Sequence, residues 1–154
     1  ISHKGEGVGA AAIEADEKAA ELMAALYQEF ERNGYSGHEV SVFLVRILFI
    51  LFGEDTRMFQ TNAFTNLLDD TNSEGKDIGG RLQELFQALN SPKDRRPSTL
   101  DPLVSVFPFV NGGLFAEQLP TFSFSKQMRQ ALLNANAYTW HEVNQGSGQG
   151  LRAL

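Results

Sequence analysis

The longest apolar run in the chain extends from Val40 to Phe52, and it constrains the fold more than any other segment. As a helix this run would be about 20 Å long, whereas the hydrocarbon layer of a bilayer is roughly 30 Å thick. It also contains two polar residues, Ser41 and Arg46. Because the run is apolar on nearly all sides, we expect it to form the buried central helix of a globular domain.

Arg46 is the unusual residue of this run, because a buried guanidinium needs carboxylates or backbone carbonyls to offset the loss of its hydration. The nearby acidic residues are Glu54, Asp55, Asp69 and Asp70. We predict a structural ion pair between Arg46 and Asp55 that fixes how two helices cross. The functional alternative is that Arg46 captures an anion or a phosphate.

Other helices are indicated by apolar residues at helical spacing. The clearest pattern follows Asp77, where apolar side chains recur every three or four residues up to Asn90. The five prolines of the chain all lie between residues 91 and 124, which favours an ordered segment that is not helical. The expected helices cover residues 10–33, 36–53, 62–68 and 78–90, and a last helix starts after Ser123 or Ser125.

Short polar residues and glycines mark the expected ends of these helices. Ser36 and Glu39 have the spacing of a capping box, and Asp77 precedes an apolar pattern as an N-cap does. Gly34 fits a C-terminal stop. Gly53 is expected to end or bend the central helix.

These features predict a mainly α, helical bundle-like domain over residues 10–143. Residues 1–9 are expected to be a disordered leader or a cut point, and residues 144–154 a flexible tail. A small β-hairpin is possible near residues 107–115, because NGG at residues 111–113 fits a tight turn. With neither a membrane span nor a signal peptide apparent, we expect a cytoplasmic protein.

Charge and composition restrict the function. The net charge of −6 is uneven, with fifteen acidic and seven basic residues up to position 90, and four acidic and six basic residues beyond it. A domain that binds DNA by itself usually has a basic face, and this chain lacks that signature. There are no cysteines, which excludes disulfides and thiolate metal sites.

No recognisable active site stands out. His3, His38 and His141 are too far apart for a local metal motif, and the acidic pairs at 54–55 and 69–70 fit caps and salt bridges. The sequence has no glycine-rich nucleotide loop, no Asn-Pro-Pro-aromatic element and no nuclease metal motif. We therefore expect no catalytic, cofactor-binding or metal-binding residue in this chain.

Two segments could contact other molecules. The first contains Asn111, Gly112, Gly113, Leu114 and Phe115, which either close a small core as a turn or dock another domain. Aromatic residues surround it, at Phe107, Phe109, Phe122 and Phe124.

The second segment contains Lys93, Arg95 and Arg96, the basic cluster of the chain, on a proline-bounded loop. This cluster can be interpreted as part of a solvated loop with no binding role, or, functionally, as a contact with a DNA backbone.

Several blocks of the sequence, in this order, resemble the helical spacer of MmeI-like combined restriction-modification enzymes. They are FLVRILFILFGEDTRMF at residues 43–59, LQELFQALN at 82–90, FPFVNGGLF at 107–115 and the helix leading to Trp140. The resemblance covers roughly residues 19–143, and RILFILFGED and VNGGLF together are fairly specific. It implies a longer polypeptide with an adenine-specific DNA methyltransferase, a target recognition domain and, in some members, a nuclease.

The resemblance further implies that this chain is a non-catalytic fragment, which links and positions the methyltransferase, and a nuclease if present, on DNA. S-adenosylmethionine would be the cofactor of the parent enzyme, and Mg²⁺ would be needed by a nuclease. Two rival interpretations remain. One is a free-standing helical module that binds another protein. The other is a small enzyme with a site built from Arg46, Asp55 and Asn111.

Overall fold

The computed structural model describes the backbone of residues 6–140 and the side chains of residues 17–140. No strand occurs in this part of the chain, so the predicted mainly α class is confirmed. The elements are α1 (Glu6–Arg32), α2 (His38–Asp55), α3 (Ala63–Asp69), α4 (Ile78–Leu89), the 3₁₀ turn η2 (Lys93–Arg95), α5 (Pro102–Ser105) and α6 (Lys126–Asn136).

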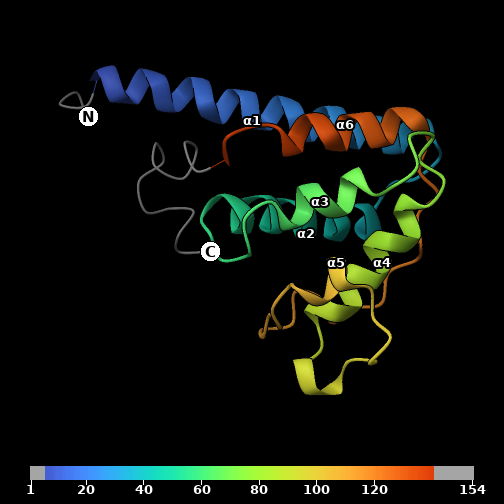
Figure 1. The fold of residues 1–154 in the computed structure, drawn as a ribbon. Coiled ribbons are helices and arrows are strands. Elements are labelled where there is room, and N and C mark those ends of the chain that lie inside the picture. Colours follow the sequence, from blue (N-terminus) through green and yellow to red (C-terminus); the bar gives the residue numbers. More distant parts are fainter. Residues whose placement is uncertain (1–5, 141–154) are drawn as a thin grey trace.

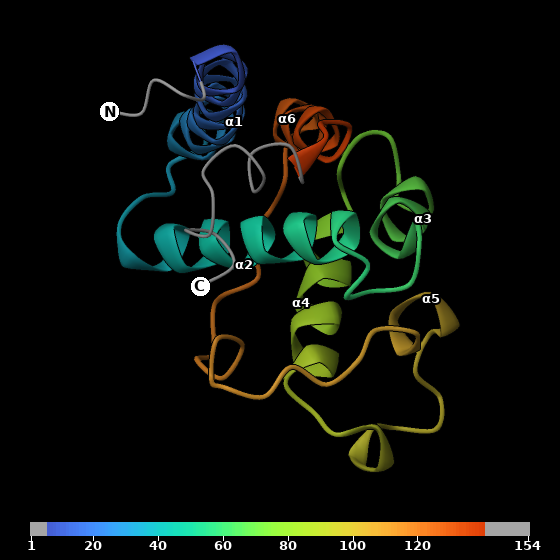
Figure 2. The same ribbon diagram turned by 90° about the vertical axis from the view of Figure 1, so that its left-hand side faces the viewer.

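The helices form three tiers. The first and last helices, α1 and α6, lie side by side and run in opposite directions at the top of Figure 1. Beneath them, α2 crosses the molecule with α3 beside it, as the end-on view of α1 in Figure 2 shows. The lowest tier holds α4, α5 and the long irregular segment that returns to α6.

The apolar run forms most of α2, and its inner face is buried, with Val40, Phe43, Arg46, Ile47, Ile50, Leu51 and Gly53 the buried residues. Phe43 lies at the centre of an aromatic cluster, with its ring centroid 5.1 Å from Phe30 of α1, 5.6 Å from Phe86 of α4 and 5.3 Å from Phe122. Tilted and edge-on ring pairs of this kind stabilise the fold beyond the effect of burying the apolar surface of the rings. The central position predicted for this helix is therefore confirmed.

None of the helices in the described part has both the length and the hydropathy to cross a bilayer.

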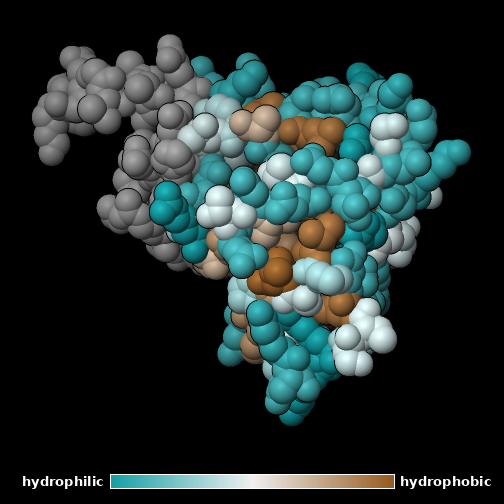
Figure 3. Space-filling model, in the orientation of Figure 1, coloured by the Kyte–Doolittle hydropathy of each residue, from teal (hydrophilic) through white to brown (hydrophobic). Residues whose placement is uncertain are grey.

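Figure 3 shows apolar residues reaching the surface in the middle of one face, under the α1–α6 pair, with polar residues around them. Among residues 17–140, the large hydrophobic side chains that are exposed are those of Val45, Met58, Val106 and Phe109.

The end of α1 is as predicted. Gly34 has a φ of 88°, and its N–H and that of Tyr35 donate to the carbonyls of Glu31 and Phe30. These two bonds make a Schellman motif, which satisfies the last carbonyls of the helix. The start of α1 at Glu6 lies within the segment predicted as a leader, while residues 1–5 and the predicted tail at 144–154 lie outside the described residues.

The predicted start of α2 is wrong. The helix begins at His38 with Gly37 as its N-cap, and no side chain makes a cap bond there. Gly37 has a φ of 86°, so a left-handed turn separates Ser36 from the first helical amides.

Gly53 does not end α2, since the helix continues to Asp55. The ring of Phe59 lies so close that a Cβ at Gly53 would meet its Cε2 at 2.6 Å. The absence of a side chain at Gly53 therefore allows the Phe59 ring to pack directly against the helix backbone.

The remaining caps are partly as predicted. Ser125 is the N-cap of α6, and its hydroxyl accepts a hydrogen bond from the Met128 N–H at 3.0 Å. Asp77 occupies the N-cap position of α4, but its carboxylate accepts from the Asn72 N–H at 2.8 Å and not from a helix amide. It therefore closes the preceding loop.

The possible hairpin near residues 107–115 does not form. Its two flanks turn their aromatic side chains, Phe107 and Phe115, into the core, and the Val110 N–H donates to the Leu89 carbonyl at the end of α4. Backbone groups that a hairpin would pair with each other are thus used to attach the loop to a helix. Gly112 and Gly113 have positive φ and the chain bends there, but the hydrogen-bonded turn follows them, where the Ala116 N–H donates to the Gly113 carbonyl at 3.1 Å.

The irregular segment that follows lies directly on α4. A Cβ at Gly79 would meet the Phe122 carbonyl oxygen at 2.0 Å, so the backbones approach as closely as only glycine allows. The Gln83 amide donates to the Leu119 carbonyl at 3.3 Å, and the Ser123 N–H donates to the Tyr35 hydroxyl at 3.0 Å. These contacts hold residues 119–124 between α4 and α1.

This close approach predicts opposite effects of one substitution at two adjacent glycines. Gly79→Ala should lower the free energy of unfolding by about 1–3 kcal/mol, because the new methyl group overlaps the Phe122 carbonyl. Gly80→Ala, where a Cβ meets nothing within 4 Å, should raise it by about 0.4–1 kcal/mol. Urea unfolding followed by circular dichroism measures both, and equal effects of the two changes would contradict the close approach.

Candidate functional site

Arg46 lies in the core with 1% of its surface exposed, and it holds the loop that the sequence singled out. Its Nε donates to the Leu114 carbonyl at 3.0 Å, and its Nη2 donates to the Glu117 carbonyl at 2.6 Å. We call this pair of bonds the Arg46 clamp. It joins the middle of α2 to a segment about 70 positions further along the chain.

Arg46 does not form the predicted ion pair with Asp55, because its guanidinium makes the clamp bonds instead. That residue lies nine positions further along the same helix, or about 13 Å away along its axis, which is too far for a direct contact. The Asp55 carboxylate instead accepts a hydrogen bond from the Trp140 N–H. The requirement that Arg46 find polar partners was correct, but backbone carbonyls meet it.

Two aromatic rings flank the guanidinium of Arg46. Its Cζ lies 5.1 Å from the ring centroid of Phe86 and 5.5 Å from that of Phe115, within the range of cation–π attraction. Desolvation lowers the pKa of Arg46, while the negative charge of Glu117 raises it. The Glu117 carboxylate is itself paired with the His38 ring, whose Nε2 lies 3.0 Å from Oε2.

The predicted docking residues differ in their exposure. Asn111, Gly112 and Gly113 are exposed, Leu114 is half-buried, and Phe115 is buried. Of the five aromatic side chains in the region, only Phe109 is exposed, at 39% of its surface. The exposed part is therefore residues 109–113, which we call the 109–113 loop.

The basic cluster is also divided. Lys93 and Arg95 are exposed on the 3₁₀ turn η2, whereas Arg96 points inward. Its guanidinium donates to the carbonyls of Ala88 at 2.7 Å, Ser91 at 3.2 Å and Ser105 at 3.2 Å. Burial lowers the pKa of Arg96. A cation that binds carbonyls at the end of α4 stabilises that helix, so Arg96 has a structural role.

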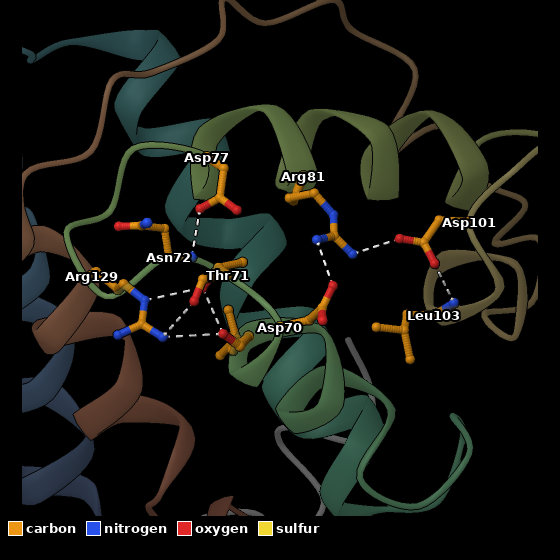
Figure 4. Close-up of polar contacts among 9 residues, drawn as sticks. Asp70, Thr71, Asn72, Asp77, Arg81, Asp101, Leu103 and Arg129 are labelled. Carbon is orange, nitrogen blue, oxygen red and sulfur yellow. Dashed lines mark hydrogen bonds and ion pairs between the residues drawn. The ribbon is translucent and has the colours of Figure 1, made fainter.

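Sequence reasoning missed a polar network that joins α3, α4 and α5 (Figure 4). Arg81 of α4 donates to the carboxylate of Asp70 at 3.0 Å and to that of Asp101 at 2.6 Å. The other oxygen of Asp101 accepts from the Leu103 N–H and caps α5. The Asp101-Pro102 pair is a recognisable helix start, but nothing in the sequence indicates its pairing with Arg81.

Arg129 makes a second link, from α6 to the end of α3. Its guanidinium donates to the Thr71 hydroxyl at 3.0 Å and to the Leu68 carbonyl at 3.2 Å, as Figure 4 shows. Thr71 is buried, and its hydroxyl donates in turn to the Leu68 carbonyl at 2.6 Å. Both networks connect helices to each other.

The described residues contain no group of three or more His, Cys, Asp or Glu side chains that could hold a metal ion. Arg46 and Asp55, two members of the alternative enzyme site, are not brought together, and Asn111 lies exposed on its loop. His3 and His141 lie outside the described residues.

Glu54, at the end of α2, is the carboxylate most affected by burial. Its Oε2 is enclosed and has no hydrogen-bond partner among the described residues. Desolvation raises the pKa of Glu54, and the backbone N–H groups of Phe64 and Thr65 at the start of α3 partly oppose this. The charge of Asp55 raises the pKa further.

A family model described as "MmeI, helicase spacer domain" matches residues 38–115, about half of the chain. The chain belongs to this family. The resemblance inferred from the sequence is thereby confirmed. Within the match lie Arg46 and Leu114, two of the three residues of the Arg46 clamp, as well as the basic turn and the 109–113 loop.

Two much longer proteins are similar to this chain over part of their length. DNA methyltransferase A of Bacillus subtilis (strain 168) is 33% identical over 136 residues, which are 84% of this chain and 15% of that protein. The solved structure of the Type IIL restriction-modification enzyme MmeI in complex with DNA matches with a TM-score of 0.75 and 36% identity. That match covers 84% of this chain and 18% of the MmeI chain, so the chain spans less than a fifth of either relative.

The environment of Glu54 predicts a pH-dependent effect of Glu54→Gln. Burial makes the pKa of Glu54 higher in the folded state than in the unfolded state. Below the unfolded-state pKa this difference contributes fully to the stability of the original chain, and the contribution is lost as pH rises through the folded-state pKa. Glutamine has no such loss. The free energy of unfolding of Glu54→Gln, relative to the original chain, should therefore increase from about pH 4 to about pH 7.

Urea midpoints at the two pH values measure this difference. Glu74→Gln, which changes an exposed carboxylate, is the matched control. A difference between Glu54→Gln and the original chain that stays constant with pH would contradict a raised pKa at Glu54.

Proposed function

We propose that this domain is a non-catalytic spacer in a larger DNA-modifying polypeptide. It would hold an S-adenosylmethionine-dependent methyltransferase domain, and a nuclease domain if there is one, in fixed positions relative to each other and to DNA. The observation that carries this proposal is that the chain matches less than a fifth of a DNA methyltransferase and of a restriction-modification enzyme bound to DNA. The lack of a metal-ligand group among residues 17–140 fits the same role.

A spacer can fix the relative positions of the domains on either side of it only if its own helices keep a fixed arrangement. Three arginines support that requirement, because each joins elements that are far apart in the sequence. Arg46 connects α2 with the loop at 114–117, Arg81 connects α4 with Asp70 and Asp101, and Arg129 connects α6 with the end of α3. Planar guanidinium groups with several donors are suited to such fixed geometry.

The 109–113 loop is the surface that we propose for docking of the methyltransferase domain. The Arg46 clamp and the His38–Glu117 contact hold the chain just after this loop, and the bond from Val110 to Leu89 holds its start. A loop fixed at both ends loses little conformational entropy when another domain binds it. Phe109 supplies an exposed aromatic group of the kind enriched in interfaces.

For the basic cluster, we propose contact with the DNA backbone through Lys93 and Arg95 alone. These two side chains are exposed on the same short turn, whereas the donors of Arg96 are used by three carbonyls. Phosphate contacts of this kind position a protein on DNA without reading its sequence.

Replacing Phe109 tests the docking role. In a polypeptide that contains both this domain and the methyltransferase domain, Phe109→Ser should lower methyl transfer to DNA severalfold, because the two domains lose an apolar contact. The unfolding midpoint of the 154-residue chain should change little, since the side chain is partly exposed. Met58→Ser, at a side chain that is 54% exposed, is the matched control and should leave methyl transfer unchanged. Equal effects of the two substitutions would remove the docking proposal.

The DNA contact is tested by salt dependence in the same longer polypeptide. Removing both charges with Lys93→Gln and Arg95→Gln should weaken DNA binding and reduce the slope of log K against log salt concentration by about two. Lys76→Gln with Lys126→Gln removes two exposed charges elsewhere and should leave the slope unchanged. An unchanged slope in the first variant would show that the basic turn does not touch phosphates.

A further inference from the structure

A small cavity of about 50 Å³ lies beside the Arg46 clamp, and neither the clamp nor the proposed function accounts for it. Arg46 and the rings of Phe86 and Phe115 line it, together with the chain at 116–119. Polar side chains of α4, including Gln87 and Asn90, complete the lining. A buried cation thus faces a space bordered by side-chain amides and by Glu117, whose carboxylate is paired with His38.

Most of the hydrogen-bonding capacity of Arg46 is unused. A guanidinium has five N–H groups, and two of those in Arg46 donate to carbonyls of the described residues. Its Nη1 makes no such bond, and it is not among the fully enclosed polar atoms without a partner. Because Arg46 is 1% exposed and lines the cavity, we infer that Nη1 faces that space.

No carboxylate of the described residues makes an ion pair with this guanidinium. The Glu117 carboxylate is the nearest source of negative charge and raises the pKa of Arg46, but its oxygens lie 3.0 and 3.1 Å from His38 Nε2. The amides of Gln83 and Gln118 donate to the Leu119 carbonyl. Gln87 and Asn90 are exposed at the cavity and can offer amide N–H groups to a ligand.

The size of the cavity restricts the ligand. About 10–15 Å³ of such space is needed for one water-sized group, so 50 Å³ admits roughly three or four non-hydrogen atoms. A carboxylate group has three such atoms, and its two oxygens match the parallel donors of a guanidinium. A phosphate has five non-hydrogen atoms, so a carboxylate matches this volume more closely.

We propose that this cavity receives the carboxylate of an aspartate or glutamate side chain from the adjoining domain of the same polypeptide. The proposal rests on the proposed spacer function, which requires such a domain. Charge complementarity supports it, because insertion of a carboxylate would neutralise a buried cation and satisfy its free donors. Arg46 would then hold the loop through the clamp and also fix the position of the adjoining domain.

Acetate, which has the head group of an aspartate side chain, is the probe for the isolated 154-residue chain. With arginine-selective ¹⁵N labelling, the Nε–H signal of Arg46 should shift in a saturable way as sodium acetate is added. Sodium chloride at the same ionic strength should cause no saturable shift. Equal responses to the two salts, or no response of Arg46, would overturn the proposal.

One substitution at the cavity and one elsewhere provide the matched comparison. Gln87→Glu places a negative charge at the cavity and should weaken acetate binding by about tenfold. Gln130→Glu makes the same change at an exposed site on α6 and should leave acetate binding unchanged. Both residues are exposed, so neither change is expected to prevent folding. Equal weakening in the two variants would indicate a general charge effect and would count against the cavity.

The longer polypeptide decides whether the ligand is a side chain of the adjoining domain. There the cavity should already be filled, and acetate should no longer shift the Arg46 signal. Binding of acetate with unchanged affinity would mean that the cavity takes a free small anion, and it would overturn the proposal. Because Phe109→Ser is measured by methyl transfer, a failure of the spacer function is seen separately from a failure at this cavity.

Discussion

A buried guanidinium that donates to backbone carbonyls, and makes no ion pair with a described residue, determines where a distant loop of this structure lies. Arg46 sits in a helix that is otherwise apolar, and it can remain there only if other groups accept its hydrogen bonds. The carbonyls of Leu114 and Glu117 do so, and they bring a distant loop onto the helix. That loop in turn carries Phe115, whose ring packs against Phe86 and Phe49. The electrostatic requirement of one residue therefore determines where an irregular segment lies.

The rest of the fold covers the apolar helix from several directions. Phe30 of α1 and Phe86 of α4 contact Phe43 from two sides, and Phe122 and Phe124 approach it from the segment before α6. Aromatic rings from four parts of the chain thus share one cluster. Polar bonds at the edge, from Arg81 and Arg129, then fix how α3, α4 and α6 are placed around it. Apolar burial assembles these layers, and arginine side chains set their geometry.

Most of the helices could be predicted from the sequence, because their apolar spacing is a local feature, but the predicted start of α2 is wrong and α5 lies in the segment expected not to be helical. The amphipathic pattern after Asp77 and the stop at Gly34 are found where predicted. The partner of Arg46 could not be predicted, because backbone carbonyls are present at every residue and only the fold selects which ones are near. For the same reason, sequence alone could not separate Arg96, which is bound to carbonyls, from the exposed Lys93 and Arg95. The family could be inferred, because it depends on ordered blocks of sequence.

The separation between the two ends of the Arg46 clamp also has a consequence during synthesis. Arg46 and Leu114 are 68 positions apart. At about 5–20 residues per second, a ribosome needs roughly 3–14 seconds to deliver the loop after the helix has been made. Throughout that interval the apolar face of α2 lacks part of its cover, and transiently exposed hydrophobic surface of this kind is prone to aggregation. Closing the clamp is thus a late event in the maturation of the domain.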